Sequence, residues 1–201
     1  MSKGKKHPGN RPDRRQYPLH DISIEHLVGS LVISWNNAEN SSKLLLNRLL
    51  GSPAGIQAVT NELNGQSLWF ALRAASSRSM HHEIEEHVRQ ISIALERLNE
   101  HRNYFVHGSL KKEGEHLVLR TEYAKGEVRE YEDRVDKQEI LQLVRDCDDI
   151  GMCAIDIIAY LILKKMGRAS SLPDKPFLPP QLDKTRRNTT ARVQEPQTSP
   201  E

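Results

Sequence analysis

The chain lacks the features that mark a secreted, membrane-spanning or metal-binding protein. Its two cysteines, Cys147 and Cys153, point about 120° apart on one predicted helix, so they form neither a disulfide nor a CxxC ligand pair. No apolar stretch follows the basic start, which argues against a secretory signal. The most apolar run, from Ile150 to Leu163, contains Asp156 and is too short to cross a bilayer. These absences predict a soluble cytoplasmic protein with no metal, no other cofactor and no membrane partner.

Motifs of nucleophilic and nucleotide chemistry are also missing. The sequence contains no GxSxG string, no glycine-rich phosphate loop and no dinucleotide fingerprint. His82 and His87 come near a zinc-protease pattern, but they are five residues apart. On a helix that spacing separates two side chains by about 140°, so they do not share a face. We therefore expect both histidines to belong to a solvated polar face.

Charge and composition divide the 201 residues into three parts. Residues 1–18 carry six basic residues, one acidic residue and three prolines, which predicts a disordered basic arm. Residues 168–201 are proline-rich and polar, and we expect a disordered tail there as well. The domain between them, residues 19–167, is mildly acidic, which argues against a main role in gripping a long nucleic-acid duplex. The arm could add salt-dependent attraction to phosphates, although a solvated tail is the preferred interpretation.

Apolar residues recur at helical spacing through most of residues 19–167. The pattern predicts one short helix over residues 54–63 and four main helices. The main helices run from a cap at Asp21 or Ser23 to Gly51, around residues 68–75, from about Met80 to His107, and from a cap at Asp136 to about Met166. Gly108 suits the left-handed position that ends many helices. Residues of about 116–134 alternate with period two instead, which predicts a small β-hairpin. The predicted fold class is all-α, an antiparallel bundle of four main helices with a hairpin between the third and fourth.

The end of the third predicted helix holds the most suggestive chemistry in the sequence. Asn103 and His107 are four residues apart and share a helix face, and Arg102 stands beside Asn103. Arg102 offers a planar fork of donors for a phosphate. The negative pole of the helix is expected to raise the pKa of a histidine in the last turn, which suits it to proton transfer. Arginine and histidine suffice for RNA cleavage without a metal, because the 2′-hydroxyl of the RNA is itself the nucleophile.

The string Arg102-Asn103-x-x-x-His107 at the end of a long helix resembles the signature of the HEPN superfamily. That resemblance spans about residues 20–167 and implies a metal-independent endoribonuclease, with Arg102 on the scissile phosphate, His107 moving the proton and Asn103 orienting the histidine or the backbone. It also implies a homodimer in which two copies of the motif form one site. A role as a toxin or defence effector would add an antitoxin as partner protein.

Two other interpretations stay open from the sequence. The same residues could form a structural helix end in a non-catalytic HEPN-like interaction module that pairs with another protein. Alternatively, the chain could be an accessory RNA-binding protein that uses residues 1–18. In either case Asp156 is expected to be a boundary residue rather than part of a site.

Overall fold

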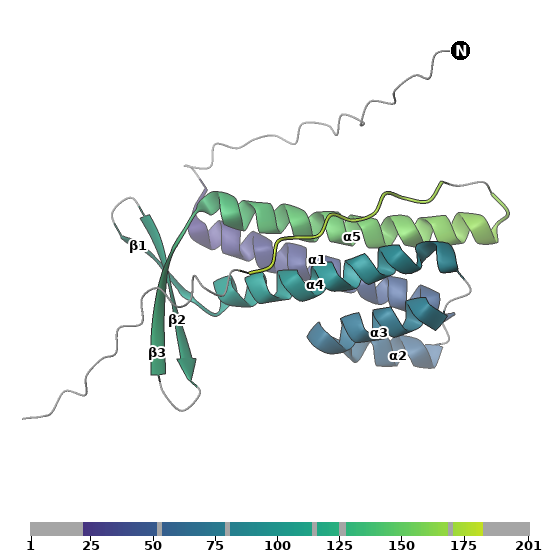
Figure 1. Ribbon diagram of the computed structural model, residues 1–201, viewed down its shortest axis with the longest axis horizontal. Helices are drawn as coiled ribbons and strands as arrows, with labels where there is room; N and C mark the ends of the chain where they lie inside the picture. Colours follow the sequence, from purple (N-terminus) through teal and green to yellow (C-terminus); the bar gives the residue numbers. More distant parts are fainter. Residues whose placement is uncertain are drawn as a thin grey trace, which may run out of the picture.

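The computed structural model describes residues 22–51, 54–78, 81–113, 116–124, 128–168 and 171–182. The predicted basic arm of residues 1–18 lies outside the described residues, as do residues 183–201 of the predicted tail. The described chain is mostly helical and carries one small antiparallel sheet at an end of the helical body (Figure 1). The order of its elements is α1 (Ile24–Leu49), α2 (Ala54–Glu62), α3 (Gly65–Arg78), a single 3₁₀ turn (His82–Ile84), α4 (Glu85–Val106), β1 (Ser109–Glu113), β2 (His116–Ala124), β3 (Val128–Val135) and α5 (Lys137–Lys165).

The predicted helix boundaries are confirmed where local capping chemistry is strong. The Ser23 hydroxyl accepts from the His26 backbone N–H at the start of α1. The Asp136 carboxylate accepts from the backbone N–H of Gln138 at the start of α5, at 3.0 Å. Gly51 follows α1 with a φ of 83°, the left-handed conformation that favours glycine at a helix end. The alternative cap, Asp21, lies outside the described residues.

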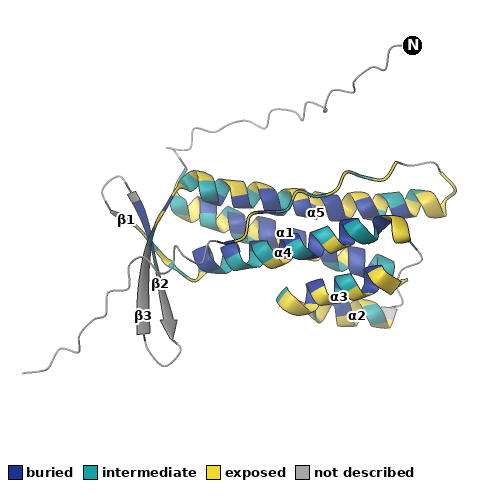
Figure 2. Ribbon diagram, viewed as in Figure 1, coloured by how far each residue is buried: buried dark blue, intermediate teal, exposed yellow. Residues whose placement is uncertain are grey.

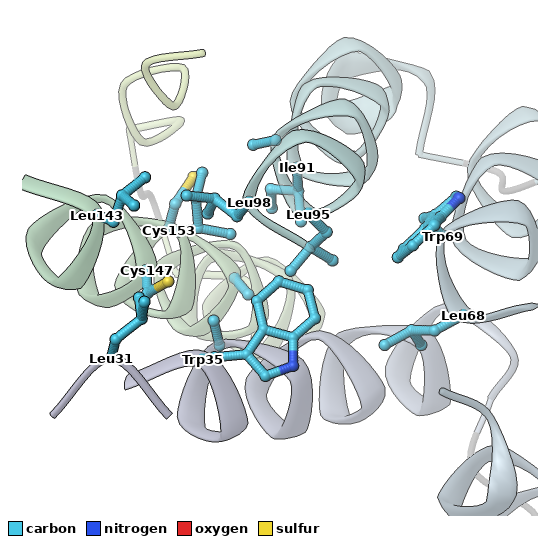
Figure 3. Close-up of a cluster of buried hydrophobic side chains, with 14 of the residues drawn as sticks. Leu31, Trp35, Leu68, Trp69, Ile91, Leu95, Leu98, Leu143, Cys147 and Cys153 are labelled. Carbon is cyan, nitrogen blue, oxygen red and sulfur yellow. The ribbon is translucent and has the colours of Figure 1, made fainter. Parts of the chain in front are cut away.

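The apolar stripes of the helices meet in one core. Trp35 of α1, Leu68 of α3, Leu95 of α4 and Cys147 of α5 are among its buried members (Figure 3). The buried residues form a stripe on each long helix, and the opposite faces are exposed (Figure 2). Burial of these stripes supplies the main driving force for the fold.

The helix directions differ from the predicted antiparallel arrangement. Lys137, at the start of α5, donates to the carbonyl of Ile22 just before α1, and Gly151 approaches Ala38 at the middle of both helices. Helices α1 and α5 therefore run parallel. By contrast, α4 is antiparallel to α5, because Glu83 before α4 pairs with Lys164 at the end of α5.

The short helix α2 explains this difference. Its Thr60 hydroxyl donates to Asn47 of α1, and the Asn61 carbonyl accepts from Lys43, so α2 runs back along α1. Because α2 adds a reversal of the chain, α3 runs in the same direction as α1. In a bundle of four main helices that alternate in direction, α3 would be antiparallel to α1.

The predicted hairpin of about residues 116–134 is confirmed as β2 and β3, but it has a third strand. The order is β1-β2-β3, with both pairs antiparallel. The short, lysine-containing β1 directly follows α4 and lacks a clear period-two pattern, so the sequence did not predict it.

The left-handed prediction for Gly108 is wrong, since its φ is not positive. A Cβ at Gly108 would instead meet Leu119 Cδ1 at 2.4 Å and the Tyr104 carbonyl oxygen at 3.0 Å. Glycine is required here for the close approach of the sheet to the helix end.

None of the helices in the described part of the chain is both long and apolar enough to span a membrane.

Candidate functional site

The Arg102–His107 segment occupies the last turn of α4, where the helix meets the sheet. His107 is the C-terminal cap residue, with φ −95° and ψ −4°, and its backbone N–H donates to the Asn103 carbonyl at 3.1 Å. The His107 side chain is exposed, whereas Arg102 and Asn103 are half-buried. A substrate in solution can therefore reach the imidazole without any rearrangement of the core.

The structure brings the Arg102 and Asn103 side chains together. Arg102 Nη1 donates to Asn103 Oδ1 at 2.9 Å, which fixes one arm of the guanidinium. Arg102 Nε is buried and has no hydrogen-bond partner among the described residues. The Asn103 amide thus holds the arginine rather than the histidine, and the remaining guanidinium nitrogen, Nη2, is the one that could meet a phosphate.

The sheet holds the helix end in place beside this segment. The Tyr104 hydroxyl, at the same turn of α4, donates to Asp133 Oδ2 of β3 at 2.7 Å. Leu119 of β2 is buried against Gly108. The backbone that carries His107 is therefore fixed from two sides by packing, as a site that needs defined geometry requires.

The helix directions set the electrostatics of this end of the body. Because α1 and α5 run parallel, both N-termini lie at the end where α4 finishes (Figure 1). The positive poles of two helices therefore accompany the negative pole of α4.

A second set of polar groups lies along α4 and was not predicted as a site. His87 and His101 are buried, with exposed fractions of 3% and 5%. The expectation that His87 is solvated is therefore wrong. His87 Nε2 lies 3.0 Å from the Pro173 carbonyl oxygen, Arg97 Nη1 donates to the Pro179 carbonyl at 2.7 Å, and His101 Nε2 lies 3.1 Å from the Pro180 carbonyl.

These contacts show that one part of the predicted disordered tail, residues 171–182, packs on the body, while residues 169–170 and 183–201 lie outside the described residues. Residues 171–182, which we call the proline segment, turn back after α5 and run along the helical body (Figure 1). Pro179 and Leu182 within it are buried. The composition of the segment predicted disorder, but three side chains of α4 supply hydrogen bonds that composition does not reveal.

Buried ionisable groups on α5 face the same region. Burial raises the pKa of the Asp146 carboxyl, with a smaller contribution from Asp149, while a hydrogen bond from Gln142 at 2.8 Å and the nearby His101 oppose the shift. Burial raises the pKa of Cys147 and of Cys153 to about 12. Both thiols stay protonated at neutral pH, so neither is suited to nucleophilic chemistry or metal binding.

A signal for the second set was present in the sequence. His87, Ala94 and His101 are seven residues apart in sequence, so they fall on one stripe of α4, close to the apolar stripe. Pro173, Pro176, Pro179 and Leu182 recur every third residue. Neither pattern alone shows that the two stretches meet. Asp156 is exposed, which confirms it as a boundary residue.

No protein-family model matches the chain, and neither a curated protein nor a solved structure is detectably similar to it. Across the described residues, no three His, Cys, Asp or Glu side chains are grouped as a metal site would require. The chemistry of the site therefore has to be argued from Arg102, Asn103 and His107 themselves.

Proposed function

We propose that this protein is a metal-independent endoribonuclease of the HEPN type, in which Arg102 and His107 form the reacting site. What supports it is that the end of α4 carries an exposed histidine and, five residues earlier, a half-buried arginine that donates to Asn103. A merely structural helix end needs neither an accessible imidazole nor a side-chain amide reserved for the arginine.

In the proposed reaction the 2′-hydroxyl of the RNA attacks the adjacent phosphorus. His107 takes the hydroxyl proton, and Arg102 stabilises the charge on the phosphorane oxygens. The P–O5′ bond breaks, and the 5′-oxygen leaves with a proton from a second acid. The products are a 2′,3′-cyclic phosphate and a 5′-hydroxyl end, so no water, metal or oxidant is consumed.

The second acid is the reason for proposing a homodimer. Among the described residues, His107 is the exposed imidazole at this end of α4, and one imidazole cannot be base and acid in the same step. His107 of a second copy would supply the proton. Action on RNA in the cytoplasm, as a toxin or defence effector restrained by an antitoxin, belongs to the same proposal.

The test is cleavage of end-labelled RNA of mixed sequence by the full chain in excess EDTA. We expect cleavage to cyclic phosphate ends, and we expect Arg102→Ala and His107→Ala each to slow it by about 10²- to 10⁴-fold. His82→Ala and Arg145→Ala, which remove the same residue types from exposed positions elsewhere, should leave the rate unchanged. Equal rates in all five proteins, or intact RNA with the wild type, would reject the proposal.

A further inference from the structure

The proline segment lies on the body with a period of three residues. Pro173, Pro176, Pro179 and Leu182 are half-buried or buried, whereas Asp174, Phe177 and Pro180, which follow each of the first three by one residue, are exposed. Leu178 is half-buried as well and packs on the core outside this period. A polyproline-II helix has three residues per turn and places every third side chain on one edge. The four prolines of the segment favour this conformation, because each fixes its own φ and keeps the preceding residue extended.

The spacing of the contacts agrees with that conformation. His87 and His101 are fourteen residues apart on α4, and their partners Pro173 and Pro180 are seven apart in the segment. Fourteen helical residues rise about 21 Å, and seven polyproline-II residues rise about 22 Å. The two histidine contacts at the ends of the segment are therefore separated by matching lengths of helix and segment.

The body recognises the backbone of the segment. His87, Arg97 and His101 each contact a proline carbonyl, and the Cys153 thiol lies 3.9 Å from the Asp174 carbonyl. We call these four residues the carbonyl-binding face. A carbonyl oxygen only accepts, so both imidazoles present a proton on Nε2. All four contacts use donors of the face, which suits a peptide whose prolines have carbonyls but no N–H groups.

Two of these donors take their hydrogen-bond partners from the segment. With the segment in place His87 and His101 are buried, and their Nδ1 atoms have no hydrogen-bond partner within the described residues. A buried donor without an acceptor is costly, so the Nε2 contacts to Pro173 and Pro180 are what satisfies the two rings. A ligand that covers this face therefore has to supply carbonyl groups to both histidines.

We propose that the carbonyl-binding face is a peptide-binding site for extended ligands of the type Pro-x-x-Pro-x-x-Pro-x-x-Leu, occupied here in cis by residues 171–182. A proline-rich segment of a partner protein would bind by replacing the chain's own segment. The chain leaves α5 in a left-handed turn at Gly167, with a φ of 69°, before the segment begins. The proposal does not depend on the ribonuclease function.

The experiment uses the full chain with a protease recognition sequence inserted between residues 168 and 171. After cleavage, a fluorescent peptide with the sequence of residues 171–182 is titrated in, and anisotropy measures binding while circular dichroism monitors the helices. We expect the peptide to displace the C-terminal fragment and to bind saturably. A peptide with Pro179 and Leu182 replaced by Asp should bind at least tenfold more weakly.

Variants of the body test the face itself. Arg97→Ala removes the donor to Pro179 and should weaken peptide binding about tenfold, in line with the loss of a charged hydrogen bond. Arg89→Ala is the matched control, because Arg89 lies on the exposed side of α4 and pairs with Glu86. Equal binding by both variants would overturn the proposal. So would a body that unfolds once the fragment leaves, or a fragment that excess peptide never displaces.

Discussion

Histidines occur in two settings on α4 and at its C-terminal cap, and the two settings suit different roles. His107 is exposed at the end of the helix, where Arg102 donates to Asn103. His87 and His101 are buried under the proline segment and contact its carbonyls. An exposed imidazole is open to the proton transfer proposed for His107, whereas a covered imidazole acts as a fixed donor. Sequence identifies the first kind by its motif, and only the fold identifies the second.

The largest effect that would test this contrast is a loss of activity without a loss of stability. His107→Ala should lower RNA cleavage by about 10²- to 10⁴-fold, because the general base is removed. The free energy of unfolding should change by less than about 0.5 kcal/mol, since the side chain is exposed. Denaturant unfolding beside the cleavage assay measures both. A large drop in stability would place His107 with the buried histidines.

The next largest effect concerns the contact that fixes the helix end. Gly108→Ala places a methyl group 2.4 Å from Leu119 Cδ1 and 3.0 Å from the Tyr104 carbonyl oxygen. We expect a loss of about 1–3 kcal/mol in the free energy of unfolding, because the sheet must move away from the helix. Gly29→Ala is the control, as nothing lies within 4 Å of a Cβ there. In the interior of α1 that change should stabilise the protein by about 1 kcal/mol.

A smaller and more local effect is expected at the covered histidines. His87→Leu keeps the apolar contact but removes the donor to the Pro173 carbonyl, at a cost of about 0.5–1.5 kcal/mol. Hydrogen exchange should become faster at the non-proline amides of residues 171–175, while α5 stays protected. His82→Leu, at an exposed position, should alter neither. Unchanged exchange in the His87 variant would show that the segment is held by its apolar side chains alone.

The smallest expected effect is a pH dependence from Asp146. Burial raises the pKa of this carboxyl in the folded state, so the folded protein binds its proton more readily than the unfolded chain. Below the pKa of the unfolded chain the carboxyl is protonated in both states, so its burial carries no charge penalty. Stability is lost as the pH rises through the pKa of the carboxyl in the folded protein. Asp146→Asn should therefore gain stability relative to the wild type between pH 4 and pH 7. Asp156→Asn, an exposed carboxyl on the same helix, controls for the lost charge, and parallel profiles for all three proteins would contradict the expectation.

Local chemistry explains which parts of the fold were predictable. Ser23 and Asp136 cap the starts of α1 and α5, and Gly51 follows the end of α1. These boundaries depend on residues only a few positions apart, so the sequence was sufficient to place them. The parallel course of α1 and α5 was not predictable, because it depends on Thr60 and Asn61 holding a weak nine-residue helix against α1. Such a helix is decided by tertiary contacts rather than by its own pattern.

The same distinction applies to the candidate sites. Asn103 and His107 share a helix face and Arg102 is next to Asn103, so the sequence alone places all three at one helix end. It does not place Arg102 and His107 on one face, because five residues separate side chains by about 140°. The burial of His87 depends on Pro173, which is eighty-six residues away in sequence. Periodicity predicts which face of a helix is covered, but it cannot identify a distant segment as the cover.

The clearance at Gly108 has a mechanical consequence. The three-stranded sheet touches the helical body close to His107, through Leu119 against Gly108 and through Asp133 on the Tyr104 hydroxyl. A Cβ at Gly108 would fall 2.4 Å from Leu119 Cδ1, so there is no room for one more carbon atom between them. Strand β2 therefore cannot move toward the helix end unless Leu119 or the backbone one residue after His107 also moves.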